Sequence, residues 1–529
     1  MAAPALAEFH ERDPVVDPEV LEAHGAVIGR VIVEPRNIFD LENPLEDKWL
    51  YRTLNRFHIV TRPATIEKQL LFKPGDVYSQ RLTNESERIV RQNSYINEIE
   101  ITPVKHQDGT VDLLVETWDV WTLTPDVTLS RSGGANKYGF GVLEENLLGR
   151  GQQIGINFVS DVDRDTIGFD FRDNHFRGTR YRFAVSADNS TDGFEYKGVY
   201  AKPFYALDST GANGITIRDG ERIDQLYDLG EVVTEFENRY RYHEAFLGWS
   251  AGLRDHWARR FFVGLAYEEN RFDSVEDSIY PTLTLPGDRK FIYPYFGMQL
   301  IRDHYETTVN FDQISRTEDR HLGLNLGFRV GYSSADAGSS ESAWHFSAGL
   351  TDTLLNNDDR ALELALNVSG RVVDGTGENI LFTGAARYHQ RLTQRQLLYA
   401  SISGSSGHNL DIDRPIQLGG DTGLRGYPLR YQTGTSKVLF TAEHRFFTDW
   451  YLFRLFHVGA AAFFDVGRSW GTASVDGVDL GWLKDAGVGL RLGKTRMGGG
   501  VVHIDLAFPL DGEDDIDGVQ LLLKVKRSF

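Results

Sequence analysis

The sequence predicts a mainly β fold, a transmembrane antiparallel β-barrel preceded by a small α/β region. Two observations carry this prediction. Apolar residues alternate with polar or small residues from Trp121 onwards, for about 400 residues. Such alternation is typical of a wall with lipid outside and a wet lumen inside. The chain also ends on an apolar strand whose last residue, Phe529, is aromatic.

The bulk properties exclude several other classes of protein. No run approaches the roughly 18 consecutive apolar residues of a membrane helix, so a helical membrane protein is excluded. A β-barrel is compatible with the mean hydropathy of -0.34, because alternating strands average out as polar. The net charge of -20 argues against nucleic acid as a partner, since phosphate binding needs a basic face. The absence of cysteine excludes disulfides and thiolate metal sites.

The 529 residues are too many for one ordinary soluble domain, and the pattern of charged, apolar and polar residues changes twice along the chain. Residues 1–24 are predicted to be a flexible segment, residues 25–121 a single α/β domain, and residues 122–529 the barrel. Ala5-Leu6-Ala7 resembles the tail of a secretory cleavage site, without the basic and apolar regions that precede one. The start is therefore either truncated or matches this pattern by chance.

Residues 25–121 are predicted to follow a β-α-α-β-β order. We expect a strand at 26–35, helices at 61–76 and 83–96, and then a β-hairpin whose turn is Asp108-Gly109. Thr61 is predicted to cap the first helix. Asn84 is predicted to cap the second, with Glu87 as its reciprocal partner. The segment 37–58 is an insertion without an assigned structure.

The barrel region contains roughly 16 to 18 candidate strands, and a bacterial barrel is expected to have an even number. Residues 321–332 and 361–369 show the alternation most clearly, with one apolar face and one small or polar face. The apolar faces consist of Leu322, Leu324, Leu326, Phe328, Val330 and Tyr332 in the first stretch, and Leu362, Leu364, Leu366 and Val368 in the second.

A soluble β-sandwich would alternate in the same way, with its apolar face turned to a core. Two features favour the barrel: the pattern has no domain boundary, and soluble domains seldom end on an apolar strand with a terminal Phe. The predicted C-terminal barrel signal lies on one face of the last strand and consists of Val519, Leu521, Leu523, Val525 and Phe529.

One stretch, "QLGGDTGLRGYPLRY" from Gln417 to Tyr431, fits neither a strand nor a helix. Its Arg425 is either a solvated loop residue or a residue carried into the lumen by a folded-in loop. In the lumen it would need a carboxylate, because an unpaired charge away from bulk water is costly. Glu443 and Asp465 are candidates, since both fall on the polar, lumenal parity of the strands that follow.

Four ordered motifs in the last 110 or so residues carry a family resemblance. "GGDTGLRGYP" resembles the (V/L/I)RG(F/Y) loop of the BamA, TamA and FhaC superfamily of outer-membrane barrels. "FFDVG" resembles the F-x-D-x-G strand motif of the same group, and "AGVGLRL", "IDLAFPL" and the terminal strand follow in the family order. "GFGVLEENLLGRGQQIGINF" resembles the opening barrel strands, and residues 25–121 resemble one POTRA domain. The resemblance covers residues 26–529.

This resemblance implies a 16-stranded barrel and a defined lumen cluster. The loop from Gly420 to Tyr427 would begin outside and fold back into the lumen, with Arg425 meeting Asp465. An arginine suits this position because its planar fork binds two carboxylates at once. The implied cluster consists of Arg425, Asp465, Glu443, Phe463, Gly426, Tyr427 and Gly420.

The resemblance also implies a function without enzymatic chemistry, namely assembly or insertion of outer-membrane proteins, or protein translocation across the outer membrane. The POTRA-like domain would lie in the periplasm of a Gram-negative-type bacterium and capture an extended client by strand addition. The barrel seam would then template the client's strands. The implied partners are unfolded outer-membrane or secreted proteins, outer-membrane lipid and lipopolysaccharide, and accessory periplasmic proteins or lipoproteins, with no nucleic acid and no cofactor.

Two alternatives remain for the function. The first is a secretion pore dedicated to one exported partner, or a passive channel, because these share the fold. The chain departs from the best-known relatives in having one POTRA-like unit where they have two, three or five, which leaves the client open. The second is an outer-membrane enzyme, but the sequence has no phosphate-binding loop, no G-x-S-x-G elbow and no H-E-x-x-H motif. No catalytic or metal-binding residue is therefore assigned.

Overall fold

The computed structural model describes residues 17–107, 110–280, 284–357, 359–471, 479–494, 496, 500–511, 516 and 518–526. Ala5-Leu6-Ala7, the Asp108-Gly109 turn and Phe529 lie outside these residues. The chain divides into two compact units, one of residues 1–123, 144–152 and 496–498, and one of residues 124–143, 153–495 and 499–529. Among the described residues, no helix is long and apolar enough to cross a membrane.

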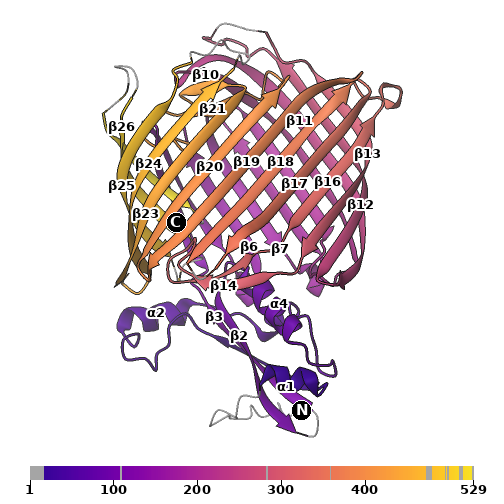
Figure 1. The fold of residues 1–529 in the computed structure, drawn as a ribbon, viewed down its shortest axis with the longest axis vertical. Coiled ribbons are helices and arrows are strands. Elements are labelled where there is room, and N and C mark those ends of the chain that lie inside the picture. Colours follow the sequence, from indigo (N-terminus) through magenta and orange to yellow (C-terminus); the bar gives the residue numbers. More distant parts are fainter. Residues whose placement is uncertain are drawn as a thin grey trace. The chain divides into compact units, whose positions relative to one another are not determined.

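The first unit is a small α/β fold built on a three-stranded sheet in the order β1-β3-β2 (Figure 1). Its strands are β1 (Val27–Arg36), β2 (Ile96–Gln107) and β3 (Thr110–Asp119), and its helices are α1 (Pro18–Ala23), α2 (Trp49–Phe57), α3 (Pro63–Glu67) and α4 (Gln80–Arg91). Strand β3 pairs in parallel with β1 and antiparallel with β2, so β1 and β2 are the two edges. The buried core includes Leu21, Ile28, Ile66, Val90, Ile96, Val111, Leu113 and Val115.

The expected β-α-α-β-β order is incomplete, because three helices separate β1 from β2. The additional helix is α2, which lies in the segment that sequence reasoning left unassigned. The predicted flexible segment 1–24 also contains helix α1, whose N-cap Asp17 accepts a hydrogen bond from the backbone N–H of Glu19 at 2.9 Å.

Both predicted helix caps are wrong. The helix expected at 61–76 is reduced to the five residues of α3, and the hydroxyl of Thr61 donates instead to Asp119 at 2.9 Å. Helix α4 begins at Gln80, so Asn84 lies in its interior, and Glu87 accepts from the backbone N–H of Ile101. Tertiary contacts with the sheet thus compete with the local capping pattern for the same side chains.

The second unit is a closed antiparallel β-barrel (Figure 1). It has 20 strands, which corrects the expected 16. Six of them precede residue 203: β4 (Leu123–Ser132), β5 (Ala135–Glu144), β6 (Gln152–Ser160), β7 (Asp165–Asp173), β8 (Arg182–Ser190) and β9 (Gly193–Lys202). Nine more precede residue 409: β10 (Gly211–Asp228), β11 (Glu231–Arg254), β12 (Trp257–Asp273), β13 (Arg289–Arg302), β16 (Asn325–Ser333), β17 (Ala343–Asn356), β18 (Arg360–Val373), β19 (Thr376–Thr393) and β20 (Gln396–His408).

The last five strands are β23 (Ser436–Leu452), β24 (Phe456–Trp470), β25 (Leu483–Lys494), β26 (Val501–Pro509) and β27 (Gln520–Lys526). These five strands follow the loop at residues 419–431, and the other 15 precede it. The number 16 came from the family resemblance, and the alternation itself does not fix a strand count, because short neighbouring strands such as β4 to β9 merge in a sequence pattern. Three short 3-10 helices, η1 (Leu147–Gly149), η2 (Phe176–Gly178) and η3 (Ala335–Ala337), complete the elements outside the in-folded connections.

The alternation places apolar side chains on the outside of the barrel. In β16, Phe328, Val330 and Tyr332 are 40%, 39% and 41% exposed, whereas the intervening Arg329 donates to Glu244 of β11 at 2.8 Å. Strand β16 begins at Asn325, so the earlier alternating residues Leu322 and Leu324 do not belong to it. An apolar outer face around a polar interior is the arrangement that a membrane barrel requires.

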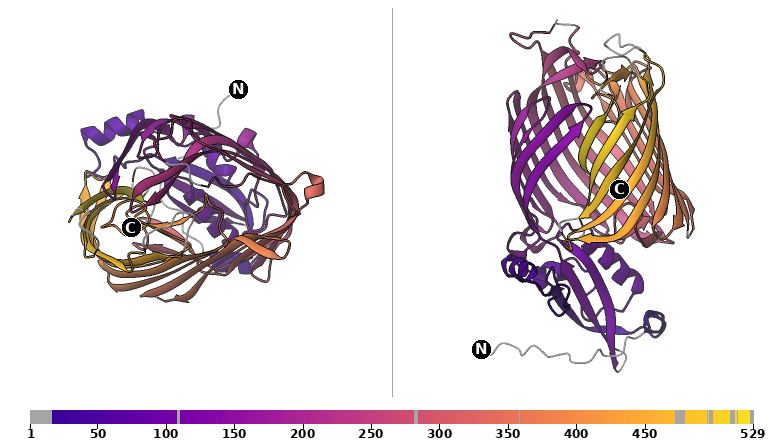
Figure 2. Two further views of the ribbon diagram at one scale, coloured as in Figure 1. Left: turned by 90° about the horizontal axis from the view of Figure 1, so that it is seen from above. Right: turned by 90° about the vertical axis from the view of Figure 1, so that its left-hand side faces the viewer.

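The barrel closes where the last strand, β27, neighbours the first, β4. We call this contact the seam. The right-hand view of Figure 2 shows the yellow C-terminal strands beside the purple first barrel strands. Leu523 of β27 pairs with Arg131 of β4 across the seam, and β26 and β27 share the run from Val501–Lys526 to Ala507–Gln520.

Two connections fold inward and carry short sheets of their own. The connection from β20 to β23 contains β21 (Ile416–Leu418) paired with β22 (Gln432–Gly434). The connection from β13 to β16 contains β14 (Tyr305–Val309) paired with β15 (Thr317–His321). Strands β13 and β20 run in opposite directions around the antiparallel wall, so the two connections lie at opposite ends of the barrel, as Figure 1 shows for β21 and β14.

Candidate functional site

The loop between β21 and β22, residues 419–431, is closed by its own backbone. The N–H of Gly420 donates to the carbonyl of Pro428 at 2.9 Å, and the N–H of Leu424 donates to the carbonyl of Gly419 at 3.1 Å. The apolar side chains of the loop are buried against β21 and β25 in a cluster of Leu418, Leu424, Tyr427, Tyr431 and Leu483. The segment is therefore packed against itself and against the barrel wall.

Arg425 lies at the tip of this loop and is 7% exposed. Its Nε and Nη2 donate to the two carboxylate oxygens of Asp465 in β24 at 2.7 and 3.0 Å, and its Nη1 donates to Glu443 in β23 at 2.8 Å. The guanidinium carbon also lies 3.4 Å from the centre of the Phe463 ring. The predicted contact of Arg425 with Asp465, beside Glu443 and Phe463, is present. A fork that binds two carboxylates while stacking on a ring is specific to arginine.

The strand period explains why the two carboxylates meet at one place. Side chains alternate between the faces of a strand, and the odd-numbered residues of β23 and β24 point into the lumen. Thr441, one position before Glu443 on this face, donates to Asp465 at 2.7 Å. Arg445, one position after it, donates to Glu443 at 3.0 Å. The carboxylates are thus held from both sides, with partners for the charge that burial would otherwise make costly.

Gly426 and Tyr427 attach the loop to the next strand. The N–H of Gly426 donates to Asp485 in β25 at 3.0 Å, and the hydroxyl of Tyr427 lies 2.8 Å from the carbonyl of Lys484 and 2.7 Å from that of Asp511. A Cβ on Gly426 would lie 2.7 Å from the Cβ of Asp485. Only glycine permits this close approach of the loop to the wall.

Gly420 lies at the seam end of the loop. A Cβ there would meet the carbonyl of Tyr427 at 2.4 Å and the backbone nitrogen of Gly133 at 2.7 Å. Its own carbonyl accepts a hydrogen bond from Ser132 of β4 at 2.6 Å. All seven residues of the predicted cluster therefore belong to one loop and its contacts, although Gly420 does not touch the ion pairs.

Sequence reasoning missed three residues of the cluster: Asp485, Arg491 and Asp505. Asp485 is fully buried beside Gly426, and Asp505 of β26 forms an ion pair with Arg491 of β25. Arg425 lies 3.8 Å from Asp505. A signal was available, because these residues fall on the lumenal parity of "AGVGLRL", "IDLAFPL" and their flanks, where a charged residue within a spanning strand needs a partner.

The geometry supports anchoring and gives no support for acid–base catalysis. Glu443 and Asp465 each accept hydrogen bonds from a guanidinium, so both carboxylates are engaged in holding Arg425. The cluster lines a cavity of about 410 Å³ together with Lys524 and Lys526 of β27. Among the described residues, no group of three or more acidic or histidine side chains could hold a metal ion.

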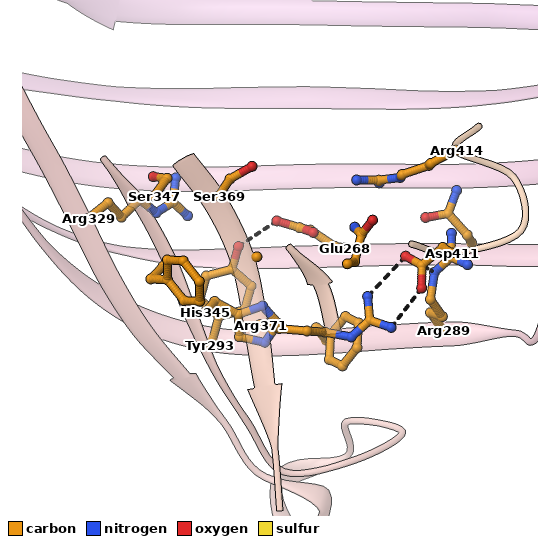
Figure 3. A pocket seen from close by; sticks show the side chains of 15 residues that line it. Glu268, Arg289, Tyr293, Arg329, His345, Ser347, Ser369, Arg371, Asp411 and Arg414 are labelled. Atoms are coloured by element: carbon orange, nitrogen blue, oxygen red, sulfur yellow. Dashed lines mark hydrogen bonds and ion pairs between the residues drawn. The ribbon is translucent and has the colours of Figure 1, made fainter. Parts of the chain in front are cut away.

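A second lumenal cavity, of about 250 Å³, lies among β12, β13 and β16 to β19 (Figure 3). Two of its polar contacts are well defined. Arg371 of β18 donates to both carboxylate oxygens of Asp411 at 2.8 and 3.0 Å, and Tyr293 donates to Glu268 at 2.5 Å, as the dashed lines in Figure 3 show. Asp411 belongs to the β20–β23 connection, so this cavity is bounded by the stem of the same in-folded segment.

The predicted C-terminal signal is placed in part. Leu521 and Val525 lie on the outer face of β27 and are 44% and 56% exposed, and Leu523 shares that face. Val519 precedes the strand and is exposed. These side chains form an apolar outer face beside the seam.

Comparison with protein families identifies the chain. A sequence model of the Omp85 superfamily domain matches residues 146–524, which is more than half of the chain. The chain belongs to the Omp85 superfamily. Its loop motif around Arg425, its F-x-D-x-G strand and its final strands lie within the matched residues. As an Omp85 protein it is an outer-membrane β-barrel of the group that assembles or translocates proteins, and members of this family are non-enzymatic.

Three solved structures align with most of the chain. BamA from Haemophilus ducreyi lacking POTRA domains 1–3 is 12% identical, with a TM-score of 0.40 over 94% of this chain and 84% of that chain. CdiB from Escherichia coli is 14% identical, with a TM-score of 0.47 over 95% and 77%. CdiB from Acinetobacter baumannii is 11% identical, with a TM-score of 0.42 over 96% and 74%. No curated protein matches the sequence.

Proposed function

We propose that this Omp85 protein inserts β-barrel proteins into the outer membrane by opening its seam and offering the freed edges of β4 and β27 to client strands. The observation that carries the proposal is the seam itself, where the first and last strands of the barrel are neighbours and Leu523 pairs with Arg131. An unpaired edge is not tolerated in lipid, so an opening seam must exchange one pairing for another. A client strand is the partner that makes this exchange productive.

The first unit has the features of a client-capture domain. Its sheet has two edge strands, β1 and β2, and an extended peptide binds such an edge by adding a strand. We assign this unit as a POTRA domain that lies in the periplasm and receives unfolded clients, helped by accessory periplasmic proteins or lipoproteins. In this proposal the activity requires no nucleotide and no other cofactor, because client strands replace the pairing that the seam gives up.

The lumen cluster has a structural role in this mechanism. Arg425 connects the loop to β23 and β24, and Gly426 connects it to β25, so the C-terminal wall moves with the loop as one body. A wall held together in this way can separate from β4 without unravelling. The outer apolar face of β27 then contacts outer-membrane lipid and lipopolysaccharide during opening.

The test is photocrosslinking in cells from three positions. A photoreactive residue replaces Leu523, on the outer face of β27 at the seam, or Glu100, which is exposed on the edge strand β2. The matched control replaces Phe328, which faces outward from β16 away from the seam. The captured proteins are identified by mass spectrometry.

The proposal predicts many different outer-membrane barrel proteins at Leu523 and Glu100, and none of them at Phe328. One recurrent exported protein at both test positions would replace the insertase with a secretion pore dedicated to that partner. Equal capture at Leu523 and Phe328 would contradict any special role of the seam.

A further inference from the structure

We propose that residues 419–431, which we call the strap, cross the seam and keep it closed, and that Arg430 and Asp163 form the anchor on the β4 side. The inference rests on the proposed function only in its consequence, that opening admits a client. The closure of the seam by the strap is a separate physical claim. Arg430 lies outside the loop motif, and sequence reasoning assigned no role to it or to Asp163.

The strap is anchored on the C-terminal side of the seam by Arg425. As described above, this residue binds Glu443 in β23 and Asp465 in β24. Gly426 adds the hydrogen bond to Asp485 in β25. These three strands precede β27 in the wall, so this anchor lies entirely on one side of the seam.

Five residues later the strap is anchored on the other side. Arg430 donates to both carboxylate oxygens of Asp163 at 2.9 and 2.6 Å, and Asp163 lies in the turn between β6 and β7. The Arg430 guanidinium also lies 4.3 Å from the centre of the Tyr227 ring in β10, and the Tyr227 hydroxyl donates to Asp163 at 2.8 Å. Thr433, just beyond the strap, donates to the carbonyl of Tyr227 at 2.8 Å.

Near its start, before the two anchors, the strap contacts both seam strands through one atom. The carbonyl oxygen of Gly420 accepts from the hydroxyl of Ser132 in β4 at 2.6 Å and from the ammonium of Lys524 in β27 at 3.1 Å. One acceptor therefore bridges the first and last strands of the barrel. Separation of β4 from β27 must break at least one of these two hydrogen bonds.

The backbone of Arg430 agrees with an anchor that is held in place. Its φ is +52°, in the left-handed region that an arginine seldom adopts. Such a conformation persists where surrounding contacts determine it. Here the contacts are the bidentate pair with Asp163 and the stacking on Tyr227. Losing the pair removes the main contact that holds this conformation, so the strap is released on the β4 side first.

The two anchors differ in strength in a way that suits opening. The Arg425 pairs are almost fully buried, with side-chain exposures of 8% for Arg425 and 0% for Asp465, whereas Arg430 and Asp163 are 21% and 25% exposed. Water screens an exposed pair more effectively, so the Arg430 anchor is the weaker one. The strap therefore stays with the C-terminal strands when the seam opens.

The absence of cysteine allows a direct measurement of seam opening. Cysteines replace Arg131 and Leu523, which are partners across the seam, and carry nitroxide spin labels. Dipolar broadening of the spectrum of the purified full-length protein in lipid reports the closed fraction, and no client is needed. Retention of the folded, heat-modifiable band on a gel is checked for every variant.

The Arg430→Gln variant is expected to raise the ratio of open to closed seam by about fivefold, the change that loss of one partly exposed ion pair produces. The exchanged pair, Arg430→Asp with Asp163→Arg, is expected to return the ratio towards that of the parent. The matched control is Arg468→Gln, because Arg468 forms a bidentate pair with Asp479 in a connection that does not cross the seam. It is expected to leave the ratio unchanged.

Three results would contradict the proposed role of the strap. The first is an open-to-closed ratio at the parent value in Arg430→Gln. The others are an equal change in Arg468→Gln and a ratio that the exchanged pair does not restore. Client capture at Leu523 is measured separately and distinguishes the two claims. If the ratio is unchanged and client capture is normal, the proposed role of the strap is wrong, whereas the proposed insertase function stands. If the ratio rises but no client is captured, the proposed role of the strap stands, whereas the proposed insertase function is wrong.

Discussion

The two in-folded connections of the barrel are held in the lumen by different kinds of contact. The β20–β23 connection enters from one end and is anchored by ion pairs to β13, β18, β23 and β24, through Asp413, Asp411 and Arg425. The β13–β16 connection enters from the other end and packs its tip on apolar side chains. Charged pairs have directions and fixed partners, whereas apolar packing depends mainly on the area removed from water.

The tip of the β14–β15 hairpin illustrates the second solution. Ile314 is 1% exposed and packs against four residues of the distant wall, Leu397, Phe447, Ala461 and Val501. The ring of Phe311 lies 4.0 Å from the ring of His389 in β19, and the Arg320 guanidinium lies 3.7 Å from the centre of the Phe311 ring. The hairpin thus spans the lumen from β13 to the C-terminal strands.

This difference indicates which of the two connections is suited to move. A loop held by ion pairs on both sides of the seam changes state when one pair breaks, which is a discrete event. A hairpin held by packing against four strands loses its contacts gradually. We therefore assign control of the seam to the strap.

The largest effect is expected for Arg425→Ala. Removal of the guanidinium leaves Asp465 as a buried charge without its ion-pair partner, whereas Glu443 keeps Arg445. We expect a cost of about 3–5 kcal/mol of unfolding free energy. Urea unfolding of the protein in lipid, followed by tryptophan fluorescence, measures it. Arg425→Lys keeps the charge but loses the fork and is expected to fall between the parent and the alanine variant. An alanine variant as stable as the parent would show that the cluster does not anchor the loop.

The next effect is expected for Ile314→Ala, which removes the buried tip of the hairpin. Truncation of a buried isoleucine costs about 2–5 kcal/mol through lost transfer energy and the cavity that remains. The control is Ile279→Ala, because Ile279 is 87% exposed, and its truncation is expected to stay within about 0.5 kcal/mol. If both variants unfold at the same urea concentration, apolar packing does not hold the hairpin.

A smaller effect is expected for Gly426→Ala. The added Cβ would lie 2.7 Å from the Cβ of Asp485 and 3.0 Å from the backbone nitrogen of Pro509, so the loop must shift, at a cost of about 1–3 kcal/mol. Gly198→Ala is the control, because nothing lies within 4 Å of its added Cβ. Equal unfolding midpoints for the two variants would contradict the close approach of the loop to β25.

The last effect is a pH dependence that is confined to the hairpin. Glu318 accepts hydrogen bonds from the backbone N–H groups of Phe311, Asp312 and Gln313 at 2.9, 2.9 and 3.1 Å. Burial raises the pKa of Glu318 to about 7, although these N–H groups oppose the rise. The unfolded carboxyl titrates lower, so the folded state binds the proton more tightly, and this contribution to stability is lost as the pH rises through about 7.

The measurement compares urea midpoints at about pH 5 and about pH 8 for the parent and for Glu318→Gln. The part of the pH dependence that is due to Glu318, with a lower midpoint at the higher pH, is expected to disappear in the glutamine variant. Identical pH dependence in both proteins would remove Glu318 as its source. The ion pairs of the strap involve arginines, which stay charged over this range, so they are expected to contribute little.

Much of the fold follows from the sequence because alternation reports directly on the two faces of a strand. The lumenal parity placed Glu443 and Asp465 on one face, and the loop motif added Arg425. The strand count did not follow, because β4 to β9 are short and closely spaced. The hairpin was missed for the same reason, since β14 and β15 have five residues each and no distinctive turn signal.

The missed part of the site has a different cause. Asp163 is about 270 residues from Arg430, and their contact depends on the closure of the barrel. No local pattern reports which turn of the first strands will lie beside a loop from the last third of the chain. Asp485 and Asp505 were within reach of parity reasoning, but their partners depend on how the loop descends into the lumen.

The most direct test of the central claim, that clients enter through the seam, is to close it covalently. Cysteines at Arg131 and Leu523 are joined by a reducible bis-maleimide in proteoliposomes, and assembly of a urea-unfolded outer-membrane barrel protein is followed by its heat-modifiable band. The control joins Phe328 and Ala348, which are partners within the wall. The account predicts that the seam crosslink stops assembly and that reduction restores it, while the control crosslink has no effect. Assembly at the parent rate with the seam joined would contradict the account.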